Sequence, residues 1–273
     1  MKSTPIFIFS AFLLLPSCNG KYERRSSENE KNTWVDKVVT KDNGALKQKE
    51  VSGDFDKIEV SQAIDAEIIK SETERVVISA PESIINEVLV DISGKELHIH
   101  YKPGMRVMNS NKVTAKIYAR DFTKLKANSA ASIKVKDKFT QEKTSVDISS
   151  AASVSGDLEA NDFEISVSSS SSFSGKIWAV DLDLEASSAA SVNISGKAKN
   201  ADISSSSASS VNAKDVIADY VKASSSSGSS IEISALSKVD ANASSGGSVN
   251  VYKKGNVTTI DKRESSGGSV NVQ

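Results

Sequence analysis

The sequence predicts an all-β protein whose second half is a parallel β-helix, a coil of short strands in which each turn stacks on the one before it. Three observations support this prediction. Apolar and polar residues alternate in short segments of residues 51–127, as is typical of half-buried strands. A block that begins and ends with serine recurs eight times after residue 127, at intervals of 18 to 21 residues, which indicates a solenoid. The residues beside these blocks also alternate, and they keep the same phase from copy to copy.

Length and composition limit the number of domains and the type of partner. The chain has 273 residues, of which 38% are hydrophobic and 25% charged, and this is enough for one or two globular domains. Its 34 basic and 35 acidic residues give a net charge of −1. Nucleic-acid-binding proteins carry a strong positive field, so we do not expect nucleic acid as a partner. No phosphate-binding glycine loop or cysteine cluster occurs in the sequence, and no cofactor is expected.

The N-terminus has the pattern of a bacterial secretion signal. Residues 6–15 are apolar, and such a run is too short to cross a hydrocarbon core of roughly 30 Å as a helix, so we interpret residues 1–18 as a signal peptide. The run ends in Leu-Pro-Ser-Cys at residues 15–18, which resembles the bacterial lipobox except for its proline. We predict that Cys18, the only cysteine, carries a lipid that anchors the chain to a membrane. The alternative is a stray thiol in a cleaved leader.

A polar tether and a β-rich region are predicted to follow. Residues 19–50 are charged and lack apolar periodicity, and a segment of this composition cannot bury a core. Residues 51–127 lead into the solenoid, with strands expected near residues 58–60, 64–68, 88–92, 97–101 and 113–119. A helical turn and two loops are expected between them, at residues 81–86, 102–104 and 109–112.

Residues 128–273 form the Ser-rich repeat, and each of its eight blocks has a first and a last serine separated by two small residues. The first serines are Ser129, Ser150, Ser169, Ser188, Ser207, Ser227, Ser245 and Ser266. The last serines are Ser132, Ser153, Ser172, Ser191, Ser210, Ser230, Ser248 and Ser269. We predict that these serines form structural ladders at the corners of the rungs.

The small residues indicate a tight corner, because a chain that turns inside a narrow tube has room only for small side chains. We expect both serines of each corner to point inward and to bond a neighbouring rung, since an unsatisfied buried donor costs about 1–3 kcal/mol. The alternative is a displayed serine surface that binds glycan or carries O-linked sugar.

Aligning the copies on the first serine separates inward from outward positions. The positions six and four residues before it, and four and six residues after it, are mostly apolar, whereas the positions between them are polar. Each rung therefore contains at least two short strands, and stacking the rungs buries one continuous core. A leucine-rich repeat would need leucine at closely spaced positions, and a disordered serine-rich chain would not keep apolar residues in phase.

The leader, the β-rich region and the corners together resemble the head GIN domain family of proposed auto-transporter adhesins. The corners at residues 246–250 and 267–271 read Gly-Gly-Ser-Val-Asn, and the resemblance covers residues 55–273. It implies a right-handed β-helix, a Bacteroidetes-type bacterial source, a role in adhesion and no established catalytic residues. Alanine or serine replaces the corner glycines in the first five copies.

One outward column of the repeat is interrupted by Lys222 and is otherwise acidic from the second rung on: Glu164, Asp183, Asp202, Asp240 and Asp261. Carboxylates one rung apart can share a cation or act as an acid and a base. We expect an ordinary solvated face with no metal site and no catalytic residue. Glu164, Asp183 and Asp202 are the candidates for loose binding of a divalent cation.

Histidines and aromatic residues supply two further candidates. His98 and His100 are the only histidines and share one face of a strand, but two ligands are too few for a closed zinc site. We expect an exposed or edge-strand pair. Trp178 is the aromatic residue best placed to stack on a sugar, with packing at the core or rim as the alternative.

These observations predict a secreted, lipid-anchored cell-envelope protein of the outer membrane that acts as a non-catalytic adhesin-like or scaffold module. Its expected partners are the membrane, through the anchor, and a glycan or an envelope or extracellular protein. The alternative is a polysaccharide-binding or polysaccharide-cleaving envelope protein, which as an enzyme would need a groove that gathers carboxylates with an arginine or lysine. The oligomeric state and the side of the outer membrane stay open.

Overall fold

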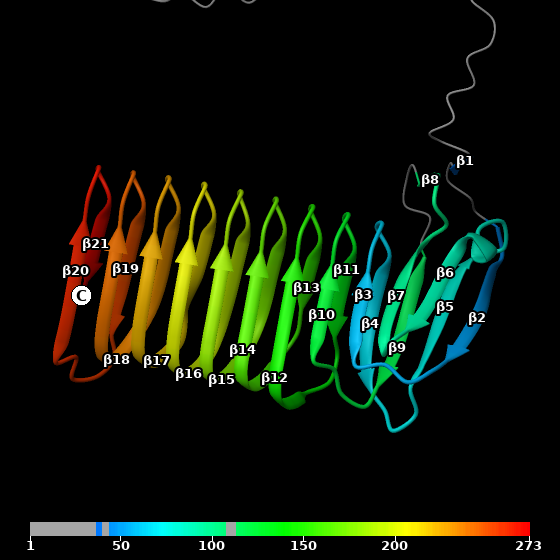
Figure 1. Cartoon of the computed structure of the whole chain (residues 1–273), viewed down its shortest axis with the longest axis horizontal. Coiled ribbons are helices and arrows are strands. Elements are labelled where there is room, and N and C mark those ends of the chain that lie inside the picture. The colour runs from blue at the N-terminus through cyan, green and yellow to red at the C-terminus, as the bar shows by residue number, and fades with distance from the viewer. Residues whose placement is uncertain (1–36, 40–43, 108–112) are drawn as a thin grey trace, which may run out of the picture. The chain divides into compact units, whose positions relative to one another are not determined.

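The computed structural model describes residues 37–39, 44–107 and 113–273. Within these residues the regular secondary structure consists of strands and one 3₁₀ turn, η1 (Ile85–Glu87). Nineteen of the strands belong to one sheet, which coils into a β-solenoid of about eight turns (Figure 1). The prediction of an all-β protein with stacked parallel strands is therefore confirmed.

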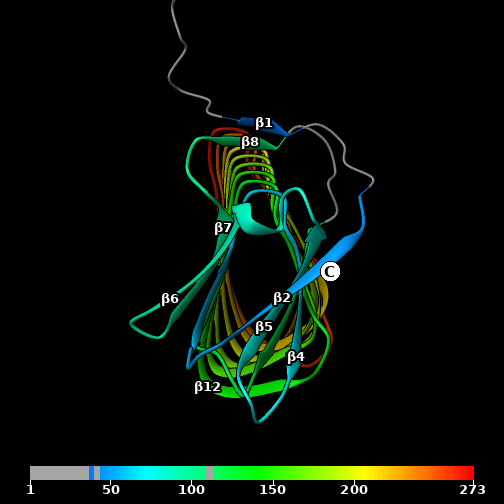
Figure 2. The same ribbon diagram turned by 90° about the vertical axis from the view of Figure 1, so that its right-hand side faces the viewer.

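The rungs of the repeat stack in register, so that each residue lies beside its equivalent in the next rung. Strand β16 (Ser191–Ser205) pairs in parallel with β15 (Ser172–Ala186) on one side and with β17 (Ser210–Ser225) on the other. The other strands of the repeat are β10 (Lys124–Ala127), β11 (Ser132–Val135), β12 (Phe139–Ile148), β13 (Ser153–Ser155), β14 (Leu158–Val167), β18 (Ser230–Ala243), β19 (Ser248–Lys253), β20 (Thr259–Glu264) and β21 (Ser269–Val272). Seen along the stack, the rungs superpose and their serine corners align (Figure 2).

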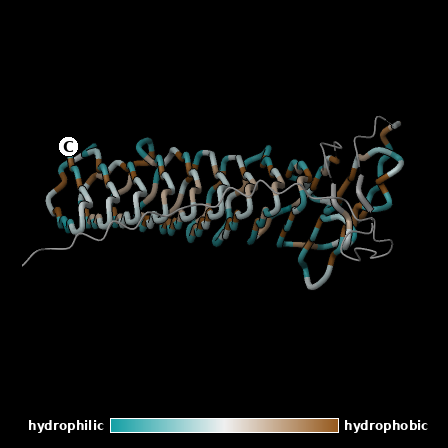
Figure 3. The backbone as a smooth tube through the Cα atoms, turned by 90° about the horizontal axis from the view of Figure 1, so that it is seen from above, coloured by the Kyte–Doolittle hydropathy of each residue, from teal (hydrophilic) through white to brown (hydrophobic). Residues whose placement is uncertain are grey.

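The core of the solenoid is filled by the apolar columns that the repeat predicts. The positions six and four residues before the first serine are buried in six consecutive rungs, from Thr144 and Val146 to Val239 and Ala241. Hydropathy accordingly alternates along each rung (Figure 3). In β20, Ile260 and Lys262 occupy the same two positions but are exposed, because β20 is the last strand of the stack on that side.

The N-terminal strands lie in a different order in space than in the chain. They are β1 (Lys37–Val39), β2 (Leu46–Ser52), β3 (Lys57–Val60), β4 (Asp65–Lys70), β5 (Arg75–Pro81), β6 (Val88–Ser93), β7 (Glu96–Tyr101), β8 (Met105–Val107) and β9 (Thr114–Ala119). Strand β3 pairs in parallel with β7 and β10, and β4 pairs in parallel with β9 and β11. The rung made by β3 and β4 is thus inserted between two later rungs, and residues 51–127 and 128–273 form one continuous stack.

Antiparallel strands cover the N-terminal end of the stack. Strand β2 pairs with β5, β5 with β9, and β6 with β7. Because β2 begins at Leu46, the prediction of a polar tether over residues 19–50 is wrong for residues 46–50. Strand β1, in the same predicted segment, pairs in parallel with β8. Residues 19–36 and 40–43 lie outside the described residues, as does the predicted signal peptide, residues 1–18.

The helical turn and one of the two loops predicted between these strands lie within the described residues. The helical turn expected at residues 81–86 occurs as η1, somewhat later in the chain, and a turn at Pro103 and Gly104 leads into β8. The loop predicted at residues 109–112 lies outside the described residues. Strand β5, which sequence analysis did not identify, has alternating burial and connects the solenoid to the antiparallel strands.

Each serine block forms a tight β-turn with two consecutive left-handed residues. In one corner Ser188 has a φ of 54° and Ala189 a φ of 61°, and the N–H of Ala190 donates to the carbonyl oxygen of Ser187 at 3.1 Å. This is the pattern of a type I′ turn. The N–H of Ala189 also donates to the carbonyl oxygen of Ser207 in the next rung at 3.0 Å, so the backbone ladder continues through the corners.

The prediction that the corner serines point inward is wrong for both serines of every block. All first serines, from Ser129 to Ser266, are exposed, and all last serines, from Ser132 to Ser269, are half-exposed or exposed. The left-handed turn directs the first side chain away from the tube, and the last serine begins the next strand on an outward position. The last serines stack in register along the outer surface, as Ser172, Ser191 and Ser210 show.

At the corners, buried hydroxyls occur instead at the third residue of the block, as at Ser209, and two residues before the first serine, as at Ser205. The Oγ atom of Ser209 lies 2.9 Å from the carbonyl oxygen of Ala186 and 2.7 Å from that of Ser206, and it accepts from the N–H of Ser206 at 3.1 Å. Ser171 and Ser229 make equivalent contacts. The prediction of a buried hydroxyl bonded to a neighbouring rung is thus met at the third residue of the block, and not at the first and last serines for which it was made.

Candidate functional site

A groove of about 730 Å³ lies at the bend of the rungs, away from the serine corners. Trp178, in its wall, follows Ser169 by nine residues and precedes Ser188 by ten, so it is about half a rung from either corner. The groove crosses five rungs, from β11 to β17. It therefore offers a long ligand contacts that repeat along the solenoid.

Glycine makes room for this groove. A Cβ atom on Gly196, which has a φ of +126°, would lie 1.9 Å from the carbonyl oxygen of Ile177. A Cβ atom on Gly175 would lie 1.8 Å from the carbonyl oxygen of Gly156. Neighbouring rungs thus touch through their backbones, and no side chain fills the surface there.

Trp178 is an exposed platform on the wall of the groove. The residue is 43% exposed, and its neighbours in register are Glu159 on one rung and Lys197 on the next. A second hollow of about 520 Å³ also borders Trp178 and is lined by Ala198 and Ile217. An indole with an accessible face can stack on a flat ligand, so the stacking role considered for Trp178 is sterically open.

Positive and negative side chains are mixed in the two hollows. Glu159 pairs with Lys138 at 2.6 Å, and Asp157 accepts the backbone N–H of Lys176 at 3.1 Å. Among the described residues, no ion pair is formed by the lining side chains Lys134, Lys176, Lys197, Lys199, Asp215 and Asp219. Asp137 and Asp157 also line the first hollow and form no ion pair among the described residues, so four ammonium groups and four carboxylates of the two hollows lack an ion-pair partner.

A second exposed aromatic residue, Tyr220, lies near the acidic column. It is 47% exposed and borders a hollow of about 300 Å³ with Asn200 and Lys238, its neighbours in register. Sequence analysis did not assign a role to Tyr220. The sequence feature that could have identified Tyr220 is its outward-facing position in the repeat, which Asn200 occupies one rung earlier.

The acidic column forms a charge ladder on an exposed face. Glu164, Asp183 and Asp202 lie in register on three consecutive rungs. Burial raises the pKa of Asp183, and the neighbouring carboxylates of Asp202 and Glu164 raise it further. Lys222 pairs with Asp202 at 2.7 Å. Across the described part of the chain, no group of three or more His, Cys, Asp or Glu side chains is placed to hold a metal ion.

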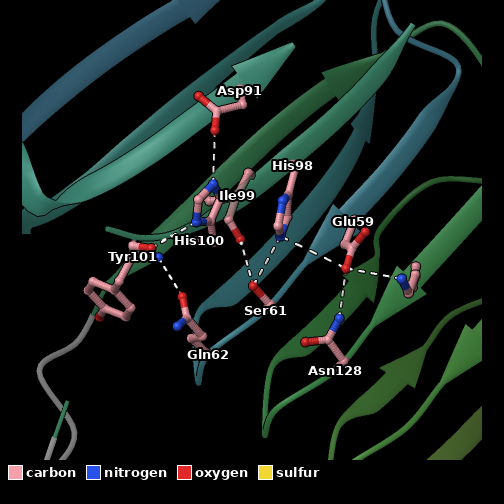
Figure 4. Close-up of polar contacts among 10 residues, drawn as sticks. Glu59, Ser61, Gln62, Asp91, His98, Ile99, His100, Tyr101 and Asn128 are labelled. Atoms are coloured by element: carbon pink, nitrogen blue, oxygen red, sulfur yellow. Dashed lines mark hydrogen bonds and ion pairs between the residues drawn. The ribbon is translucent and has the colours of Figure 1, made fainter. Parts of the chain in front are cut away.

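The two histidines lie together on β7, with their rings stacked and their centroids 4.1 Å apart (Figure 4). His100 Nε2 lies 2.9 Å from a carboxylate oxygen of Asp91, and its Nδ1 lies 2.8 Å from the carbonyl oxygen of Tyr101. Burial lowers the pKa of His98, opposed by the nearby carboxylate of Glu59. Both rings are half-buried, and β7 has neighbours on both sides, so the expectation of an exposed or edge-strand pair is wrong.

Ser61 and Glu59 approach His98 in a way that does not form a catalytic triad. Ser61 Oγ lies 3.2 Å and Glu59 Oε1 3.9 Å from the same atom, His98 Nε2 (Figure 4). In a triad, the carboxylate holds the other ring nitrogen so that the first can activate the serine. Ser61 is also only 5% exposed. This cluster has the contacts of a structural junction between β3 and β7.

Sequence reasoning missed most of the groove, although it singled out Trp178. It assigned Gly156 and Gly175 to an inward column, whereas both are half-exposed at the bend. The sequence feature that could have indicated the bend was glycine at the same position of two successive rungs. Cys18 lies outside the described residues. The described chain contains no helix with the length and hydrophobicity that membrane crossing requires.

The fold and the groove define a β-solenoid protein with an open groove on its surface. The family described as "putative auto-transporter adhesin, head GIN domain" matches residues 54–255. The chain belongs to this family, as the corner motifs indicated.

Solved structures share the fold at low sequence identity. A putative adhesin from Parabacteroides merdae is 20% identical, with a TM-score of 0.79 over 86% of this chain and 99% of that one. A putative lipid binding protein from Parabacteroides distasonis is 18% identical, with a TM-score of 0.73 over 87% of this chain and 100% of that one. A putative adhesin from Bacteroides fragilis is 16% identical, with a TM-score of 0.59 over 84% and 97%. No curated protein matches the chain.

Proposed function

We propose that this protein is a lipid-anchored module of the outer membrane whose solenoid attaches to a ligand outside the cell body without cleaving it. The observation that carries the proposal is the groove at Trp178, which crosses five rungs and combines an exposed indole with free charged side chains. Membership of an adhesin-like family supports attachment rather than catalysis. The lipobox-like sequence ending at Cys18 supports the anchor.

The contacts of the polar clusters also favour a non-catalytic role. Asp202 is paired with Lys222, and Glu59 and Ser61 share one nitrogen of His98. Neither arrangement provides an acid and a base that converge on the groove. The groove has its own carboxylates, at Asp137, Asp157, Glu159 and Asp215, and an alternative role in polysaccharide cleavage would use two of them as acid and base.

The anchor is tested by metabolic labelling with palmitate in cells that produce the full chain. The wild-type chain is expected to incorporate label and to fractionate with membranes, and Cys18→Ser is expected to abolish both. Ser17→Ala, which keeps a small residue before the cysteine, is the matched control. Unchanged labelling of Cys18→Ser would contradict the anchor.

Attachment is tested with the same cells on immobilised polysaccharides and envelope fractions. Cells with the wild-type chain are expected to be retained more strongly than cells with Cys18→Ser, which releases the solenoid from the surface. New reducing ends are measured in the same wells. Failure of retention on every surface, or release of sugar fragments by the purified chain, would overturn the proposal.

A further inference from the structure

Trp178 lines both hollows of this surface, and so does Lys197, its neighbour in register on the next rung. The two hollows therefore adjoin at the indole. The first crosses five rungs, from β11 to β17, and the second extends the surface to Leu236 of β18. Rungs are spaced by roughly 4.8 Å, so five rungs cover about 19 Å along the stack. A ligand that follows the groove over this length is a chain of several units.

The second hollow gives the indole apolar neighbours. Ala198, Ile217 and Leu236 line it together with Trp178, and Ile217 and Leu236 are only half-buried. The C–H face of a sugar ring is apolar and packs against aromatic and aliphatic surfaces, whereas its hydroxyl groups point outward to polar partners. This part of the surface therefore suits a ligand whose units have an apolar face and a polar edge.

The charges of the two hollows favour a ligand without charge. Four ammonium groups and four carboxylates there lack an ion-pair partner within the described residues. A polymer of either sign would meet four like charges, which disfavour its binding. An ammonium group only donates hydrogen bonds and a carboxylate only accepts them, whereas a hydroxyl group does both. An uncharged chain with many hydroxyl groups can therefore bond the groups of both signs.

Donors and acceptors also follow one another along the groove. Lys176 and Asp215 belong to one column of the repeat, with Ser195 between them in register, and all three line the first hollow beside Trp178. A chain that runs across the rungs thus meets an ammonium group, a hydroxyl group and a carboxylate in turn. Successive units of a polyhydroxyl ligand can bond each of them.

We infer that the surface at Trp178 binds an uncharged polysaccharide, with one sugar ring stacked on the indole and sugar hydroxyl groups bonded by lysines and aspartates on either side. This inference rests on the proposed function and names the ligand class of its groove. The ammonium group of Lys197 donates to the sugar, and the carboxylate of Asp215 accepts from it.

Binding is measured by calorimetry with three uncharged hexasaccharides, cellohexaose, mannohexaose and xylohexaose. The charged probes are hexagalacturonate, which is acidic, and the glucosamine hexamer of chitosan, which is basic. The full chain is used in a Cys18→Ser background, so that no lipid contributes. We expect at least one uncharged probe to bind at least about tenfold more tightly than both charged probes. Its Kd is expected to stay within about twofold when salt is raised, because the ligand has no charge to screen.

The residues are tested by substitution. Trp178→Ala is expected to weaken binding about tenfold, and Trp178→Phe to restore part of that loss, because a smaller ring still stacks. Lys197→Ala and Asp215→Ala are each expected to weaken binding about fivefold, since an uncharged ligand uses donor and acceptor alike. Tyr220→Ala is the matched control, because Tyr220 is 47% exposed but lines a different hollow, and it is expected to bind like wild type. Circular dichroism and melting temperature verify that each variant is folded.

The outcomes separate this inference from the proposed function. If cells are retained on surfaces but none of the uncharged hexasaccharides binds the purified chain, the inference is overturned and the proposed function stands. If a hexasaccharide binds as expected but cells are retained on no surface, the proposed function fails and the ligand class of the groove is supported.

The remaining outcomes decide the ligand class and the place of the site. Equal or tighter binding of a charged probe would overturn the inference, as would tighter binding by Asp215→Ala or by Lys197→Ala. Binding to phosphatidylethanolamine vesicles without binding to any hexasaccharide would assign the mixed charges to a zwitterionic lipid surface and overturn it. Equal losses in Tyr220→Ala and Trp178→Ala would contradict the placement of the site at the groove.

Discussion

Glycine substitution at two adjacent residues of one corner is predicted to change stability in opposite directions. Ala189 has a left-handed backbone with a φ of 61° and an exposed side chain, whereas Ala190 does not have a positive φ and is 2% exposed. Both residues are alanine, and each lies between a serine and an alanine. They differ in backbone conformation and in burial, and both differences make the two substitutions opposite in sign.

The magnitudes follow from this geometry. A left-handed conformation costs a non-glycine residue about 1–2 kcal/mol, and glycine adds a backbone entropy cost of about 0.5–1 kcal/mol. Ala189→Gly is therefore expected to stabilise the protein by about 0.5–1 kcal/mol. Ala190→Gly has the same backbone entropy cost and also removes a buried methyl group, which contributes about 0.8 kcal/mol. It is therefore expected to destabilise the protein by about 1.5 kcal/mol.

Equilibrium unfolding in urea, followed by far-ultraviolet circular dichroism, measures both changes as shifts of the midpoint at constant slope. Gly246→Ala is the reverse control, because Gly246 has a φ of +74° and an added Cβ atom would meet nothing within 4 Å. It is expected to destabilise by about 0.5–1 kcal/mol. If Ala189→Gly destabilises as much as Ala190→Gly, the corners store no conformational strain and the reasoning is refuted.

Three further predictions concern a buried hydroxyl, a histidine and the last rung. Ser209→Ala should destabilise by about 1–3 kcal/mol in urea, whereas Ser188→Ala, at an exposed hydroxyl, should change stability by less than about 0.5 kcal/mol; equal effects would contradict the inward position of Ser209. The folded-state pKa of His98 is lowered from 6.5, so as the pH falls the unfolded chain takes up this proton before the folded chain does. The contribution of His98 to stability is therefore complete above pH 6.5 and is lost as the pH falls further. His98→Gln should flatten the decline in melting temperature between pH 7 and 5, and an unchanged slope would exclude His98 as the cause of that decline. Lys262 and Glu264 occupy inward positions of the last rung and bond the backbone of Val270, so Lys262→Val with Glu264→Ala should produce concentration-dependent self-association in sedimentation, which a strictly monomeric double variant would disprove.

The sequence was sufficient to predict which residues of the repeat fill the core. Alternation with period two separates the two faces of a strand, and eight copies at nearly constant spacing repeat that separation. For this reason Phe163, Leu184 and Ile203 were assigned inward positions that the structure confirms. The family could also be identified from the sequence, because its corner motifs are local.

Which strands pair with each other could not be predicted in the same way. The alternation in residues 57–70 indicates two strands and their inward faces, but it contains no information on which strands they pair with. The placement of β3 and β4 between later rungs depends on contacts with β7, β9, β10 and β11. Such pairing is decided by packing between residues that lie far apart in the chain.

The sequence by itself thus determined the β-solenoid, the phase of its core and the candidate stacking residue Trp178. Only the tertiary structure decided that the corner serines face outward, because this depends on the left-handed φ of Ser188 and its equivalents rather than on residue size. It also decided that Gly156 and Gly196 border the groove at Trp178, with Gly196 beside Ile177 of the neighbouring rung. Their placement arises from the pairing of neighbouring rungs, and a groove exists only where rungs that are about 20 residues apart in the chain come together in space.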